Sequence, residues 1–127
     1  MAKKLELNLY LSAQITPNFS PMDPSSTYTE IGTQLTETHG ITTGQMFGKP
    51  CLKIKNKAFS AFFQEEMVFK LGRDHIPALI EELPGAILWD PSGKKRPMKD
   101  WLQVPGDHRD QWASLAEQAL GFVEAQL

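Results

Sequence analysis

Cysteine and net charge are both scarce in this chain of 127 residues. Cys51 is the only cysteine, so no disulfide can form within the chain, which is usual in a reducing cytoplasm, and the thiol is most simply a small core residue. The formal net charge is -2, which excludes the broad positive field of a protein that grips nucleic acid with its whole surface. A nucleic-acid interface would have to be a local patch.

Long apolar runs are missing as well. No stretch reaches the roughly 20 apolar residues of a membrane-spanning helix. The N-terminal leucines alternate with Glu6 and Asn8, which interrupt the apolar run that a signal peptide needs. We therefore expect a cytoplasmic protein with no membrane partner. The length suits one core, so we expect a single domain over 26–127 behind an N-terminal arm and Pro-rich connector over 1–25.

The leucine alternation over residues 3–12 has the period of a β-strand. Three prolines between residues 16 and 26 then favour an extended connector. Three arrangements of the arm remain open: pairing with a sheet edge of its own domain, pairing with a neighbouring subunit, or mobility.

What the chain does have is a centre of alternating apolar residues between Gly44 and Gly72. Apolar residues recur with a period of two in three short runs, which predicts three antiparallel strands. The glycine at position 48 and the proline at position 50 are interpreted as a kink that bends the first strand. The residues expected to face the helices are Leu52, Ile54, Phe59, Phe63, Met67 and Phe69.

Three helices and two further strands complete the predicted order. The first helix is expected to start near Ser26 or Thr27, where Thr27 and Glu30 have the spacing of a capping box, and to end at Gly40. The remaining elements are a helix over 73–83, strands over 86–89 and 98–104, and a final helix capped by Asp107. The prediction is an α+β fold with a five-stranded antiparallel sheet and the order α-β-β-β-α-β-β-α.

Several short motifs follow one another in this order. They are Met46-Phe47-Gly48, Asn56-Lys57, Met67 to Leu71, and Arg96 to Trp101 running into Val104-Pro105, with Trp112 and the last helix completing the set. In this order and spacing the chain resembles the TfoX N-terminal domain family, related to the YjbR-like proteins, over about residues 26 to 125. The resemblance implies a two-layer fold of the type shared with secretion chaperones, with helices on one face of the sheet. Because the family includes part of a bacterial competence regulator, it also implies a bacterial protein with a regulatory role.

Catalytic and metal sites are not predicted. His39, His75 and His108 lie far apart, without the short spacings of metal ligands. The glycines at 44 and 48 do not form a phosphate-binding loop, because no helix follows them. We therefore expect no enzymatic activity, no cofactor and no metal.

The face of the sheet away from the helices is the predicted interaction face. Side chains alternate along a strand, so basic and aromatic residues should gather there. The predicted members are Lys53, Lys55, Phe62, Lys70, Lys99 and Trp101.

This face has two interpretations. Its aromatic side chains either bury against a protein partner or second subunit, or stack nucleic-acid bases while the lysines neutralise phosphates. We favour the first, because the net charge is acidic and a two-layer fold leaves one sheet face to be covered. The predicted function is a non-enzymatic regulatory or protein-interaction module that forms a homo-oligomer or binds another protein. A nucleic-acid-binding accessory protein is the alternative, and an enzyme or small-molecule sensor with a pocket between arm and sheet is the third choice.

Overall fold

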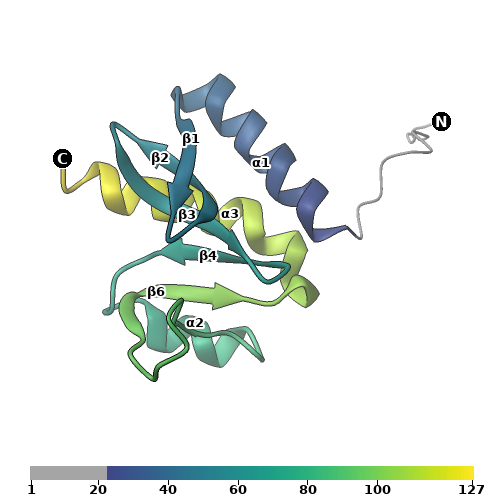
Figure 1. Ribbon diagram of the computed structural model, residues 1–127, viewed down its shortest axis with the longest axis vertical. Helices are drawn as coiled ribbons and strands as arrows, with labels where there is room; N and C mark the ends of the chain where they lie inside the picture. Colours follow the sequence, from purple (N-terminus) through teal and green to yellow (C-terminus); the bar gives the residue numbers. More distant parts are fainter. Residues whose placement is uncertain (1–22) are drawn as a thin grey trace.

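The computed structural model describes residues 23–127, in which three α-helices pack on one face of a six-stranded antiparallel sheet (Figure 1). The predicted strand-like arm and the prolines of its connector before Asp23 lie outside the described residues. The elements are α1 (Pro24–His39), β1 (Thr42–Met46), β2 (Lys49–Ile54), β3 (Lys57–Phe63), β4 (Glu66–Lys70), α2 (Ile76–Glu82), β5 (Ile87–Trp89), β6 (Met98–Val104), a short 3-10 turn η1 (Gly106–His108) and α3 (Arg109–Glu124).

The sheet has one strand more than the five predicted, and the strand order across it is β1-β2-β3-β4-β6-β5. The strand that the prediction missed is β1, which pairs with β2 from Thr42 opposite Lys53 to Met46 opposite Lys49. Phe47 and Gly48 connect the two strands with positive φ angles of 54° and 75°, the backbone of a tight two-residue hairpin turn. The interpretation of Gly48 as a kink within one strand is therefore wrong.

The start of α1 also differs from the prediction. Asp23 is the N-cap, its side chain accepts a hydrogen bond from the Ser25 backbone N–H at 3.1 Å, and Pro24 occupies the first helical position. Thr27 lies inside the helix and is not its cap. The helix ends as predicted at Gly40, whose φ of 67° is left-handed.

The other two helices begin later than the sequence suggests. α2 starts at Ile76 and has Pro77 in its first turn, as expected. Asp107, the predicted cap of α3, lies within η1, and α3 begins at Arg109 after His108. A 3-10 turn therefore separates β6 from α3 and takes up the residues assigned to the helix start.

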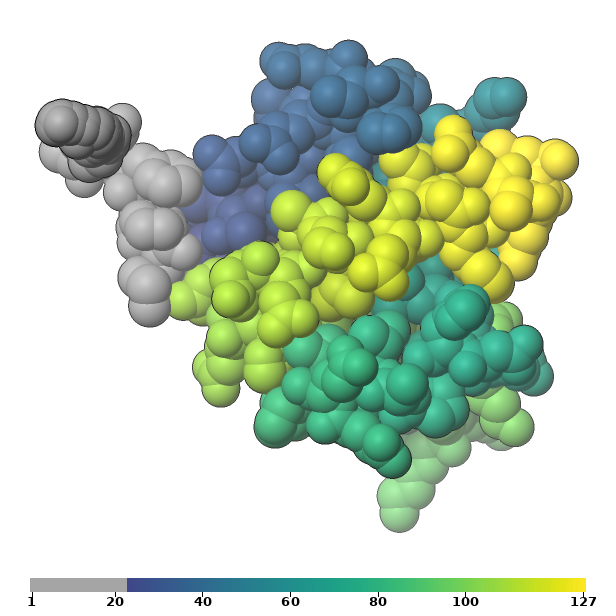
Figure 2. Space-filling model, turned by 180° about the vertical axis from the view of Figure 1, so that it is seen from behind, coloured from purple at the N-terminus to yellow at the C-terminus, as the bar shows by residue number. Residues whose placement is uncertain are grey.

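The main core lies between the helices and the sheet. Figure 2 shows the helix side of the molecule, where α1, α3 and the region of α2 lie next to one another over the sheet. Trp112 of α3 is fully buried at the centre of this layer, where it packs with the inward side chains of the strands. The sheet contributes Leu52, Ile54, Phe59, Met67, Phe69, Leu102 and Val104.

Candidate interaction site

The sheet face away from the helices holds a second apolar cluster and is not an open surface. We name it the outer-face cluster: Cys51, Ala61, Phe63, Val68, Trp89 and Trp101, all of them buried. Trp101 lies on this face as expected, yet only 6% of it is exposed. Trp89 is fully buried and packs on Trp101 with 5.3 Å between ring centroids. These aromatic rings are thus covered within the chain itself.

Phe62 and Phe63 face opposite sides from those predicted. A β-bulge in β3 is the reason: Lys53 pairs with Ala58 and Leu52 with Ser60, which leaves Phe59 as an extra residue. The extra residue reverses the alternation along the rest of the strand. Phe62 therefore points to the helix side, where its ring lies 5.2 Å from that of Tyr28 in α1.

The predicted lysines do not form one patch. Lys53 is half-buried and lies opposite Ala58, at the margin of the outer-face cluster. Lys55 is exposed in the β2–β3 turn, with a φ of 47°. Lys70 pairs with Trp101 in the sheet register and also borders a hollow at the end of α3. Their charges are distributed along the margins of the sheet.

Lys99 lies on the helix side, contrary to the prediction. Leu88 of β5 pairs with Leu102 of β6, but the next residue of β5, Trp89, pairs with Met98. This register shift breaks the alternation of side chains along β6. Lys99, two residues before Trp101, therefore does not lie on the same face of the sheet as Trp101. Lys99 instead lines a groove beneath α2.

The curl of the sheet explains how the outer face becomes covered. β1 and β5 are the two edges of six strands, which in a flat sheet with ~4.8 Å between neighbours would lie ~24 Å apart. Yet the rings of Phe47, after β1, and Trp89, in β5, are only 5.9 Å apart. In Figure 1 the β1–β2 hairpin bends across the face opposite α3. The hairpin therefore closes over the outer-face cluster, and Lys49 of β2 lies 5.6 Å from the centre of the Phe63 ring.

Two of the four large hydrophobic side chains that are exposed among the described residues lie at the β5 end of the sheet, and the other two are Phe47 and Leu127. Ile87 of β5 is 55% exposed and Ile80 of α2 is 37% exposed. Within residues 23–127, β5 pairs only with β6, so its other edge has no strand partner there. An edge with free backbone groups and apolar neighbours is a site for adding another strand.

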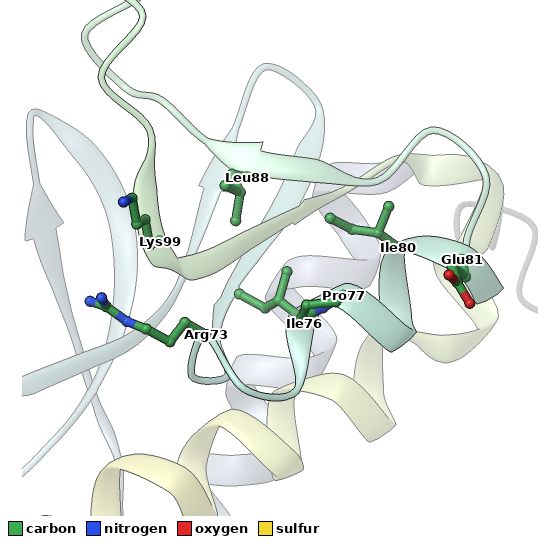
Figure 3. A pocket seen from close by; sticks show the side chains of 7 residues that line it. All are labelled: Arg73, Ile76, Pro77, Ile80, Glu81, Leu88 and Lys99. Atoms are coloured by element: carbon green, nitrogen blue, oxygen red, sulfur yellow. The ribbon is translucent and has the colours of Figure 1, made fainter.

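A hollow lies on each face of this edge. On the helix side, a groove of about 460 Å³ runs between α2 and β5, and Ile76, Pro77, Ile80 and Leu88 form its apolar lining (Figure 3). On the other face, a hollow of about 450 Å³ is bordered by Ile87 and by the loop that follows β5. We name Ile80, Ile87 and these two hollows the β5 edge site. Sequence reasoning missed it, because strand order, and hence which strand forms an edge, is not encoded locally.

Hydrogen bonds fix the loops that border the site. The Asp90 carboxylate accepts hydrogen bonds from the Ser92 hydroxyl at 2.8 Å and from the backbone N–H groups of Gly93 and Arg96. These bonds, that of Ser92 foremost, hold the pKa of Asp90 below its ordinary value. Near the groove, the Arg73 side chain donates to Asp100 at 3.2 Å and lowers the pKa of that carboxyl. The loop that follows β5 and the β4–α2 loop are thus held by hydrogen bonds.

His39, His108 and Cys51 take structural positions, whereas His75 borders a hollow with Leu71 and Phe122. His39 Nδ1 lies 2.8 Å from the Thr38 hydroxyl, and His108 Nε2 donates to the Pro84 carbonyl at 2.9 Å. Burial raises the pKa of the Cys51 thiol, which disfavours the thiolate. Over residues 23–127 there is no group of three His, Cys, Asp or Glu residues that could hold a metal ion.

Comparison with known proteins gives no match to a family model, a curated protein or a solved structure. Among the described helices, none is both long and apolar enough to cross a membrane. The described residues form an α+β domain with an open antiparallel sheet of six strands, in which the edge strand β5 carries the exposed Ile87.

Proposed function

We propose that this chain is a non-enzymatic protein-interaction module that binds its partner through the β5 edge site. The observation that carries the proposal is the combination of an edge strand with exposed Ile87 and a hollow on each of its faces. Added strands bind through backbone hydrogen bonds and place alternate side chains in pockets on the two faces of the sheet. The β5 edge site supplies both requirements.

The lining of the site favours binding over catalysis. Aliphatic side chains from α2 and β5 dominate the groove, and of its three charged lining residues Arg73 is bonded to Asp100, while Lys99 and Glu81 lie at opposite ends and do not converge on one point. We include in this proposal the resemblance to the TfoX N-terminal domain family, with its secretion-chaperone type of fold. We also propose a regulatory role in a bacterial cytoplasm. A lone thiol such as that of Cys51 suits such a reducing compartment.

The nucleic-acid alternative has less support than the sequence suggested. Stacking of bases requires accessible aromatic faces beside the lysines. Trp101 is 6% exposed and Phe62 faces the helices, so the two aromatic side chains assigned to this role do not present their rings beside Lys53.

Affinity capture from lysate of the native cells tests the proposal with three forms of the full chain. The wild type should retain a protein partner, and Ile87→Lys should lose it, because a lysine on the edge strand disfavours strand addition. Thr43→Lys places the same residue at an exposed position on β1, the opposite edge, and should retain the partner. A partner that binds all three forms equally would contradict the assignment of the site.

A further inference from the structure

Charge of opposite sign lies at the two ends of β5. Lys99 and Arg73 lie at one end of the helix-side groove and Glu81 at the other, with β5 between them (Figure 3). Lys99 follows the residue that pairs with the last position of β5, so the basic end corresponds to the C-terminal end of the strand. The exposed residues Lys94 to Arg96 come after that end, and Glu82 follows Glu81 before β5 begins.

These charges are free to meet charges on another molecule. Lys99 and Glu81 have no ion-pair partner within residues 23–127. Arg73 pairs with Asp100, so the basic character of its end comes from Lys99 and from residues 94–96. A strand that docks on β5 would therefore meet acidic groups at the N-terminal end of β5 and mainly basic groups at its C-terminal end, where the Asp90 carboxylate already accepts hydrogen bonds from Ser92 and from the backbone of Gly93 and Arg96.

We propose that the partner of the β5 edge site is a second copy of this chain, with the two β5 strands paired antiparallel about a twofold axis. In such a pair the N-terminal end of each strand lies beside the C-terminal end of the other, and the same patch serves both subunits. Glu81 and Glu82 of each copy then approach the basic end of the other copy. The proposal rests on the proposed function, because it names the occupant of the same site.

The apolar part of the β5 edge site fits the same symmetry. Leu88 pairs with core residue Leu102 and so faces the helix side, whereas Ile87 pairs with Gln103 and faces the outer side. A twofold axis perpendicular to the sheet keeps each face continuous across the pair. The two α2 helices then lie on one face, which brings their exposed Ile80 side chains together over the Leu88 pair. One continuous sheet of twelve strands, six from each copy, would result.

The first test is self-association of the full chain, measured by sedimentation velocity over a range of protein concentrations. The wild type should form a dimer, and Ile87→Lys should weaken it about tenfold or more, since burying an unpaired charge at an interface opposes association. Thr43→Lys, on the opposite edge, should leave the dimer unchanged. A wild type that stays monomeric at all concentrations, or a dimer that Thr43→Lys weakens and Ile87→Lys does not, would overturn the proposal.

The second test uses two variants, each of which reverses the charge at one end of β5. One variant carries Glu81→Lys with Glu82→Lys, and the other carries Lys94→Glu with Lys99→Glu. Each variant alone should dimerise about tenfold or more weakly than the wild type, because like charges then meet at both ends. An equimolar mixture should regain dimers, since each end again joins opposite charges. Because a misfolded variant could not be restored by mixing, a mixture no better than its components would overturn the arrangement.

The two proposals fail differently. A monomeric wild type whose capture of another protein depends on Ile87 would overturn the second copy as partner and leave the proposed function standing. A dimer that is insensitive to Ile87→Lys, together with captured partners that are equally insensitive, would remove both.

Discussion

Replacement of Trp101 by alanine tests whether the outer face of the sheet is a core or a binding surface. The side chain is 94% buried, since its relative exposure is 6%, and it contacts the fully buried Trp89. Burial of ~150–250 Å² at ~25 cal/mol per Å² corresponds to ~4–6 kcal/mol as an upper bound. Measured Trp-to-Ala replacements in cores cost ~3–5 kcal/mol, which we take as the expected loss of unfolding free energy.

Urea unfolding followed by far-UV circular dichroism measures this loss. Phe47→Ala is the matched control, because Phe47 contacts the same Trp89 ring but is 63% exposed, so it should cost about 1 kcal/mol or less. Trp101→Ala should not cost less than about 1 kcal/mol with an unchanged slope of unfolding free energy against urea concentration. That result would mean that the outer face is not a core, and it would refute the covering of this face by the β1–β2 hairpin.

Two further predictions concern Gly72, which follows β4, and Asp100, which lies in β6. Gly72 has a φ of +88°, and an added Cβ would lie 2.6 Å from the Phe122 ring, so Gly72→Ala should lower the urea midpoint by the equivalent of about 2–5 kcal/mol. Gly93→Ala, with a φ of +69° and nothing within 4 Å, should cost only about 1–2 kcal/mol, and equal losses would contradict the contact. Because Arg73 lowers the folded pKa of Asp100, the carboxylate contributes stability above its unfolded pKa of about 3.9, and this contribution is lost as the pH falls through the folded value. Asp100→Asn should therefore reduce the fall in the urea midpoint between about pH 5 and pH 2, and an unaltered acid profile would contradict the pairing.

The alternation of apolar residues predicted the helix-side core well. Met67 and Phe69 face the helices because β4 keeps a regular register with both of its neighbours, and Leu52 also faces the helices although the register with β3 shifts directly after it. The strand over 98–104 has the bounds that its residues predicted. These features depend on local periodicity, which a sequence carries directly.

The candidate site could not be predicted in the same way. The bulge at Phe59 reverses the faces of Phe62 and Phe63, and the shift between β5 and β6 moves Lys99 to the helix side. Both depend on pairing with a neighbouring strand, which alternation within one strand does not record. The polar segment that forms β1 was missed for a similar reason, since its pairing with β2 overrides a weak intrinsic preference for strand.

Amide hydrogen exchange of β5 at low and high protein concentration shows directly whether two copies of the chain pair through this strand. Strand pairing between two copies would protect the outward-facing backbone N–H groups of Ile87–Trp89 as the dimer forms, whereas exchange in β1, at the opposite edge, should not depend on concentration. We expect concentration-dependent protection confined to β5 and the adjacent part of α2. Exchange in β5 that is the same at all concentrations, or protection that appears at β1 instead, would contradict it.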